Sequence, residues 1–408
     1  MRKEQLDFLN WEFGVFLHFG IRTFYEGHRD WDMKPMDLSS FNPKDLDCDE
    51  WLRSIHEAGA KYAILVCKHH DGFANWPSAY TEYSVKNTPW KGGEGDVVRE
   101  FVDACRKYNV KVGLYYSPAQ FGSSEVKSTD YDNYFINQIR ELLTGYGKID
   151  YLWFDGCGSE NHKYDTARIV SEIRKCQPDI LIFNMWQPDT RWVGNEAGVA
   201  HSPNRSTVGA LDFSINKDIQ DLLDEPKFLP VECDCRMRLE NWFYSENDED
   251  TVKSLDELMG LYYYSVGRGA NLLLNIGPDR SGRLPERDKK ALIAFGKTVQ
   301  KYFGDPIACT AKCDKEKTLT LEIDCQLINH VILAEEIDPN NEIESFEIKA
   351  YPFPYGAPIT VYRGTTVGHK AICPFPTIKT KKIEICFDRE KRVYAAVKYI
   401  PYFDSIDS

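Results

Sequence analysis

Short apolar runs alternate with longer amphipathic stretches along the first three quarters of the chain. Seven runs have the length and residue types of β-strands: 13–20, 62–68, 110–117, 150–155, 180–185, 228–233 and 271–276. Amphipathic stretches between them predict helices at 49–60, 96–109, 131–146, 164–176, 251–266 and 286–302. This alternation is typical of parallel strands joined by crossover helices, and we expect an eighth strand between residues 198 and 213. The pattern predicts an α/β fold, a (β/α)8-type barrel over residues 1–305, distorted between residues 177 and 247, where helical signals are sparse.

The pattern of apolar and polar residues changes after Gly304-Asp305-Pro306. Short alternating β-type runs separated by turn residues follow to the end of the chain, which predicts a β-sandwich over residues 306–408. The sequence shows no clustered aromatic residues there beyond Tyr351, Phe353 and Tyr355, which favours a unit that braces the barrel over one that binds sugar.

Composition narrows the possible partners. The chain has 408 residues, which favours two domains, and a formal net charge of −13, which argues against a nucleic-acid partner. It contains neither an apolar stretch long enough for a membrane helix nor a secretion-type segment at its start, so we expect no membrane partner. Twelve cysteines without a CxxC pair favour reduced thiols and a cytoplasmic location.

The candidate binding and catalytic residues lie at the ends of the predicted strands. Active-site groups of such barrels project from the carboxyl ends of the strands, where this chain has His18, His69, His70 and Asp155. Three imidazoles beside a carboxylate suit either a metal ion or the hydroxyl groups of a sugar. Barrel metal hydrolases usually present an HxH pair from the first strand, whereas this chain has a single histidine there. We therefore expect a sugar site without metal or other cofactor, and keep a metal-dependent barrel hydrolase as the alternative.

Aromatic residues near these positions offer flat apolar surfaces for a deoxy sugar. The candidates are Trp31, Trp76, Trp153, Trp192 and Trp242, of which about half are expected to be core residues.

Glycoside hydrolysis requires two carboxyl groups. Asp155 is the first candidate. For the second, Glu196 lies in a glycine-flanked stretch at 191–198, and Glu232 lies at the end of a later strand; we favour Glu196.

Six short motifs occur in an order and spacing that resembles glycoside hydrolase family 29, the α-L-fucosidases. They are HFG at 18–20, KHHDGF at 68–73 followed by WPS at 76–78, GLYYSP at 113–118, WFDG at 153–156, RWVGNE at 191–196, and GRG at 267–269 with LLLN at 272–275. The resemblance covers about 280 residues. Any one of these strings is weak evidence, but six in sequence are specific.

The resemblance implies a retaining mechanism with Asp155 as nucleophile and Glu196 as acid/base. RWVGNE is typical of the branch that acts on α-1,3- and α-1,4-linked fucose. The substrates would be fucosylated oligosaccharides or glycoconjugates, from which the enzyme releases terminal L-fucose. A non-catalytic carbohydrate-binding protein remains a further alternative, although both carboxyl groups are present.

The resemblance also implies the sugar contacts. His18, His69 and His70 would hold fucose hydroxyls, and Trp31 would stack on the sugar. Of the other tryptophans, we expect Trp153 and Trp192 to contact the substrate on the ground of their aromatic surfaces alone. One tyrosine of GLYYSP reaches the sugar in the family. Because adjacent strand residues face opposite ways, either Tyr115 or Tyr116 has this role, and we select Tyr116. The family's Glu-Trp pair is Asp30-Trp31 here, which shortens that carboxylate by one methylene.

Overall fold

A parallel barrel of eight strands makes up the first part of the chain. The computed structural model describes residues 1–26, 36–119, 131–158, 162–211, 221–307, 310–313 and 317–401. The barrel strands are β1 (Phe13–Leu17), β2 (Tyr62–Lys68), β3 (Lys111–Tyr116), β4 (Tyr151–Phe154), β5 (Leu181–Phe183), β6 (Arg191–Trp192), β9 (Val231–Arg236) and β10 (Asn271–Ile276). They pair in the order β5-β4-β3-β2-β1-β10-β9-β6. A parallel bridge between Phe183 and Thr190 brings the end strands together, so the predicted barrel is confirmed and nearly closed.

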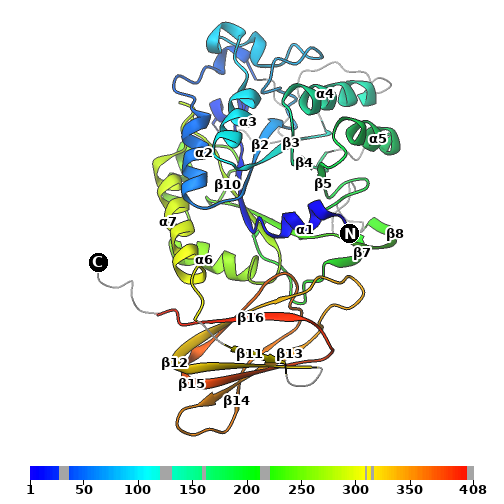
Figure 1. Cartoon of the computed structure of the whole chain (residues 1–408). Helices are drawn as coiled ribbons and strands as arrows, with labels where there is room; N and C mark the ends of the chain where they lie inside the picture. Colours follow the sequence, from blue (N-terminus) through cyan, green and yellow to red (C-terminus); the bar gives the residue numbers. More distant parts are fainter. Residues whose placement is uncertain are drawn as a thin grey trace.

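Helices surround this barrel on its outer side (Figure 1). They are α2 (Cys48–Glu57), α3 (Val97–Lys107), α4 (Tyr131–Gly145), α5 (Thr166–Cys176), α6 (Leu255–Tyr264) and α7 (Glu286–Phe303), with α1 (Lys3–Leu9) before the first strand. The side chains of Asp47, Asp96 and Asp165 accept backbone N–H bonds at the start of α2, α3 and α5, which explains why these helices begin where they do. Along β2 every residue is buried, as expected of a strand with a helical layer outside and side chains inside.

Aromatic residues close the amino-terminal end of the barrel. Phe8, at the end of α1, contacts Tyr151 with ring centroids 5.4 Å apart, and Trp11 contacts Tyr62 at 5.3 Å. Tyr62 and Tyr151 are the first residues of β2 and β4. This end is therefore packed, and the opposite, carboxyl end is left for a site.

The eighth barrel strand differs from the prediction. It is β6, Arg191–Trp192, and not a strand between 198 and 213. That region instead contributes β7 (Thr207–Leu211), which pairs antiparallel with β8 (Asp221–Phe228) as a separate two-stranded sheet. A two-residue strand is too short to show a periodic pattern, which is why the sequence did not reveal it.

The expected distortion is present on the same side of the barrel. In the part of the chain that the structure describes, no α-helix lies between the end of α5 at Cys176 and the start of α6 at Leu255. The predicted strand 228–233 falls across a break: Phe228 ends β8, and β9 starts at Val231 after Pro230. Pro230 cannot donate a backbone hydrogen bond, so it separates the two strands.

The C-terminal part is all-β, as expected. Its strands are β11 (Thr310–Cys313), β12 (Thr318–Glu335), β13 (Phe346–Pro352), β14 (Ile359–Gly364), β15 (Ala371–Phe387) and β16 (Val393–Lys398). All pair antiparallel. The long strands β12 and β15 each have a further partner along part of their length. β13 pairs with the second half of β15, and β16 pairs with the second half of β12. The unit has its own apolar core, which includes Leu321, Val331 and Ile385.

Polar contacts join this unit to the base of the barrel. Lys370 forms an ion pair with Glu12, and Tyr263 on α6 hydrogen-bonds His330 at 2.7 Å. The backbone N–H of Ile372 donates to the carbonyl of Gly267 at 3.0 Å. Figure 1 shows the unit next to α6, away from the carboxyl ends of the strands. No described helix combines the length and apolar character of a membrane span.

Candidate active site

A cavity opens at the carboxyl ends of the barrel strands. Its volume is about 710 Å³, within the roughly 300–1,000 Å³ typical of small-molecule sites. Its lining includes five of the residues that the sequence offers as candidates for binding or catalysis: His18, His69, His70, Asp155 and Glu196. The structure therefore brings these candidates, separated by up to 178 residues in the chain, into one site.

Asp155 follows β4 directly and is held by three donors. Its Oδ1 accepts the backbone N–H of Cys157 at 2.9 Å, and its Oδ2 accepts the hydroxyl of Tyr115 at 2.9 Å. His70 Nε2 lies 3.4 Å from the same Oδ2. Burial acts to raise the pKa of Asp155, but His70 and these hydrogen bonds outweigh it and hold the pKa below its usual value. The carboxylate is thus ionised at neutral pH, as a nucleophile must be.

The histidines are buried and fixed by neighbours. His18 Nδ1 lies 2.7 Å from Asn275 Oδ1 on β10, and His70 Nδ1 lies 2.5 Å from Ser117 Oγ. Burial lowers the pKa of His18 to about 3 and that of His69 well below its ordinary value. Both rings are therefore neutral, and each can donate from one nitrogen and accept at the other.

His69 carries a nitrogen suited to a ligand. Its ring stacks on Tyr115 with centroids 5.5 Å apart and planes inclined by 9°. Among the described residues, its buried Nδ1 has no hydrogen-bond partner. That nitrogen is closed off from solvent, but the neutral ring lines the cavity and can offer its other nitrogen to a hydroxyl.

Tyr115, and not Tyr116, faces the cavity, which corrects our choice. Tyr115 lines the cavity and donates to Asp155. Tyr116 points to the helical layer, where its hydroxyl donates to Gln138 Oε1 on α4 at 2.6 Å. The two side chains lie on opposite faces of β3, as the pleat requires, but the sequence does not say which face is inward.

The selected tryptophans divide between the cavity and the core. Trp153, Trp192 and Trp242 line the cavity. Trp76 does not line it; the side chain is 2% exposed and its indole donates to Glu141 at 2.9 Å. Trp31, with Asp30, lies outside the described residues.

Glu196 and Glu232, the two candidates for the second carboxyl group, occupy different places. Glu196 is exposed and lines the cavity. Its segment runs beside β9, with Val193 donating to the carbonyl of Glu232 at 3.0 Å and Gly198 to that of Asp234 at 3.1 Å. Gly198 has φ +73°, and a Cβ there would lie 2.8 Å from Cys235 Sγ, so only glycine fits this approach. Glu232 is completely buried inside the barrel, below the cavity floor.

A third acidic residue lies near Glu196. Asp234 lines the cavity and accepts the indole N–H of Trp192 at 2.6 Å. Burial raises the pKa of Asp234 well above its ordinary value; the bond from Trp192 opposes this, and the charges of Glu196 and Glu232 add to it. Asp234 is therefore protonated more readily than a free aspartate, and it keeps Trp192 in place at the cavity wall.

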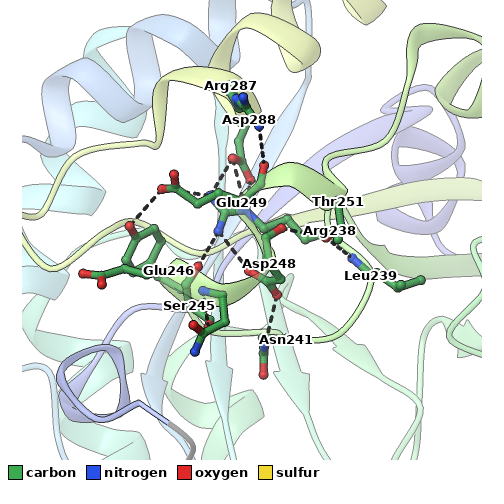
Figure 2. A network of polar contacts seen from close by, with 12 residues as sticks. Arg238, Leu239, Asn241, Ser245, Glu246, Asp248, Glu249, Thr251, Arg287 and Asp288 are labelled. Carbon is green, nitrogen blue, oxygen red and sulfur yellow. Dashed lines mark hydrogen bonds and ion pairs between the residues drawn. The ribbon is translucent and has the colours of Figure 1, made fainter.

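The loop after β9 closes one side of the cavity and is held by a buried arginine. Figure 2 shows Arg238 at the centre of this network. Its guanidinium binds Asp288 on α7 at 2.8 Å and Asp248 at 3.0 Å. Asp248 in turn accepts from Asn241 at 2.9 Å. Asn241 and the next residue, Trp242, both line the cavity, so the network fixes their position.

Three side chains of the site are also placed to hold a metal ion. Ligand atoms of His69, His70 and Asp155 all lie within 4.8 Å of one another. His70 and Asp155 already contact each other, and the three groups suit either a sugar hydroxyl or a divalent ion such as zinc. A chelator separates the two.

Comparison with known proteins decides the family. The profile of the alpha-L-fucosidase family matches residues 2–303. The chain belongs to the alpha-L-fucosidase family. It is 32% identical over 437 aligned residues to Alpha-L-fucosidase 1 of Arabidopsis thaliana, covering 94% of this chain and 84% of that protein.

Solved structures agree with this assignment. The chain resembles the crystal structure of a putative alpha-L-fucosidase from Bacteroides ovatus, with a TM-score of 0.87, 33% identity, and coverage of 98% of this chain and 74% of that one. It also resembles a glycoside hydrolase 29 family member from a rumen bacterium, with a TM-score of 0.88, 32% identity, and coverage of 99% and 78%. The chain is therefore a glycoside hydrolase of the alpha-L-fucosidase type.

Several cavity residues of this fucosidase family member were not selected from the sequence. Asp234 and Arg236 continue the inward-facing alternation of β9 that starts at Glu232, and Glu240 and Asn241 follow on the next loop. A period of two along 232–236 was the available signal, but the predicted strand ended at 233.

Proposed function

We propose that this chain is a retaining exo-α-L-fucosidase that releases terminal L-fucose from α-1,3- and α-1,4-linked branches of oligosaccharides or glycoconjugates. The observation that supports it best is an ionised, triply hydrogen-bonded Asp155 in the same cavity as the exposed Glu196. A retaining glycosidase needs one carboxylate that attacks and one carboxyl group that donates a proton.

In the first step Asp155 attacks the anomeric carbon, and the bond to the leaving oxygen breaks. Glu196 gives its proton to that oxygen, which leaves as the hydroxyl of the remaining glycan. In the second step Glu196 takes a proton from water, the water oxygen attacks the anomeric carbon, and Asp155 is released as a carboxylate. Two displacements at one carbon return the original configuration.

The neutral rings of His18 and His69 support recognition of the sugar. Each can donate to one hydroxyl and accept from another without adding charge. Trp153 and Trp242 give the cavity aromatic walls, which suit the methyl group and apolar face of a 6-deoxy sugar. His18, His69 and Trp153 are buried, whereas Glu196 in the same cavity is exposed, which favours a terminal sugar over an internal one.

Polar residues other than the histidines and the two proposed catalytic carboxyl groups also line the cavity. Arg236, Glu240 and Asn241 line the same cavity. Donors and acceptors there suit the hydroxyls of a second sugar, and a branched substrate places two sugars next to the fucose. This supports the preference for α-1,3 and α-1,4 branches.

A panel of α-1,2-, α-1,3-, α-1,4- and α-1,6-fucosylated oligosaccharides tests the specificity. We expect free fucose mainly from the α-1,3 and α-1,4 compounds, and Glu196→Gln should lose far more activity on these than on an aryl fucoside with a good leaving group. Faster release from α-1,2 or α-1,6 compounds would refute the linkage preference. Equal losses on both substrate types would move the acid/base role away from Glu196. Binding without any release would indicate a carbohydrate-binding protein.

A further inference from the structure

Glu232 has no role in the chemistry proposed above, yet it is a fully buried acid at the centre of the barrel. Its exposed fraction is 0%. Three aromatic side chains donate to it: Tyr62 to Oε2 at 2.7 Å, Trp153 to Oε1 at 2.8 Å, and Tyr151 to Oε1 at 3.3 Å. Burying an ionisable group costs free energy, so a carboxyl group kept here calls for a reason beyond packing.

The indole N–H of Trp153 depends on Glu232 for a hydrogen-bond partner more than the hydroxyls of Tyr62 and Tyr151 do. Tyr151 also hydrogen-bonds the hydroxyl of Thr190 at 2.9 Å, and Tyr62 has the carbonyl of Leu272 within 3.5 Å. In the described part of the chain, the indole N–H of Trp153 donates to Glu232 alone. An indole has one donor and no acceptor, so loss of Glu232 leaves it without a buried partner.

Trp153 in turn forms the floor of the cavity beside the nucleophile. Its ring stacks between Phe183, with centroids 4.1 Å apart, and Tyr115, at 5.4 Å. Tyr115 is the residue that donates to Asp155. A rotation or shift of the indole would therefore move both a wall of the sugar site and a donor to the nucleophile.

We infer that Glu232 is a positioning residue for fucose hydrolysis: from below the cavity it fixes the indole of Trp153, and thereby Tyr115 and Asp155. The inference rests on the proposed fucosidase reaction but not on its linkage preference or stereochemistry.

Glu232→Met tests this directly, because methionine fills similar space and offers no good acceptor. We expect kcat/KM on an aryl α-L-fucoside to fall about 10-fold, as for a buried donor left unpaired. Glu232→Gln keeps one acceptor oxygen for the indole and should stay within about threefold of the wild type. Tyr151→Phe is the matched control: it removes a donor to the same oxygen but leaves the Trp153 bond, and should change kcat/KM less than about twofold.

A double-mutant cycle separates positioning from general stability. In a Trp153→Phe background the indole N–H is absent, so Glu232→Met should lower kcat/KM less than about twofold further. The affinity for L-fucose, measured by calorimetry, should follow the same pattern, and this readout remains available if the wild type does not turn over the aryl fucoside. A wild type that does not turn over the aryl fucoside would contradict the proposed reaction, and the affinity measurements would still test the role of Glu232.

An equal loss from Glu232→Met in both backgrounds, or no loss in either readout, would overturn the inference. If Glu232→Met does not fold, Glu232→Asp replaces it in the same cycle. Aspartate keeps the carboxyl group but draws it one methylene away from the indole. A loss confined to the background with Trp153 would support the inference, and an equal loss in both backgrounds, or no loss, would overturn it.

Discussion

Tyr115 and Tyr116 are adjacent, equally buried tyrosines with different partners, and each is the control for the other. Removing the Tyr115 hydroxyl takes a 2.9 Å hydrogen bond from Asp155. A hydrogen bond to a charged group contributes about 1.5–3 kcal/mol, and one pKa unit corresponds to about 1.36 kcal/mol. Because this bond favours the ionised form, Tyr115→Phe should raise the pKa of Asp155 by about 1–2 units.

The pH profile of kcat/KM on an aryl fucoside measures this shift, since its acid limb reports the nucleophile of the free enzyme. In the wild type the pKa of Asp155 is held below its usual value, so the acid limb should lie below the pH range of an ordinary aspartate. Tyr115→Phe should move it upward by at least about one unit.

Tyr116→Phe should leave the acid limb in place, because that hydroxyl donates to Gln138 on the helical side. It should lower the free energy of unfolding by about 1–3 kcal/mol, since the buried Gln138 oxygen loses its donor. If the acid limb stays in place in Tyr115→Phe, or moves equally in both variants, the assignment of Tyr115 to the nucleophile is wrong.

Three further predictions follow from buried charges and from the histidine cluster. Arg238→Ala leaves Asp248 and Asp288 buried without their partner and should lower the free energy of unfolding by about 3–5 kcal/mol in a denaturant titration; a loss below about 1 kcal/mol would show that the network does not anchor the loop. Burial raises the pKa of Glu232 to about 7 from 4.5, so this group favours the folded state at low pH and loses that contribution as pH rises through 7. The difference in free energy of unfolding between Glu232→Gln and the wild type should therefore move in the variant's favour, by up to roughly 3 kcal/mol from pH 5 to pH 8, and a difference independent of pH would contradict it. Dialysis against a chelator should leave kcat/KM on the aryl fucoside unchanged; a loss restored by zinc would instead support a metal at the histidine cluster.

The sequence predicted the barrel and most of the site because both depend on local signals. The apolar runs of β2 and β10 were found within one residue, since buried parallel strands are continuously apolar. Asp155 and His69 were found because polar residues directly after such runs mark the carboxyl end of a barrel strand. Glu196 lines the cavity and Glu232 is buried inside the barrel. The choice of Glu196 as the acid/base stays a prediction.

The remaining errors have two physical causes: one depends on which way a side chain faces, and the others on where a strand begins or ends. Tyr116 was chosen over Tyr115 because both faces of β3 are buried, so hydrophobicity does not mark the inward one. Trp76 is not an error of this kind: about half of the five tryptophans were expected in the core, and Trp76 packs there. Strand β6 was missed because two residues carry no period. Asp234 was missed because the predicted strand ended at residue 233, whereas β9 continues to Arg236.

Trapping the covalent intermediate is the most direct test of the central claim, that Asp155 attacks the sugar. A 2-deoxy-2-fluoro-α-L-fucosyl fluoride slows the second step of a retaining enzyme more than the first, so the glycosylated protein accumulates. Peptide mapping by mass spectrometry should find the fluorofucosyl group on Asp155, and Asp155→Asn should remain unlabelled. A label on another residue, or hydrolysis that first yields β-L-fucose without any labelled protein, would contradict the account.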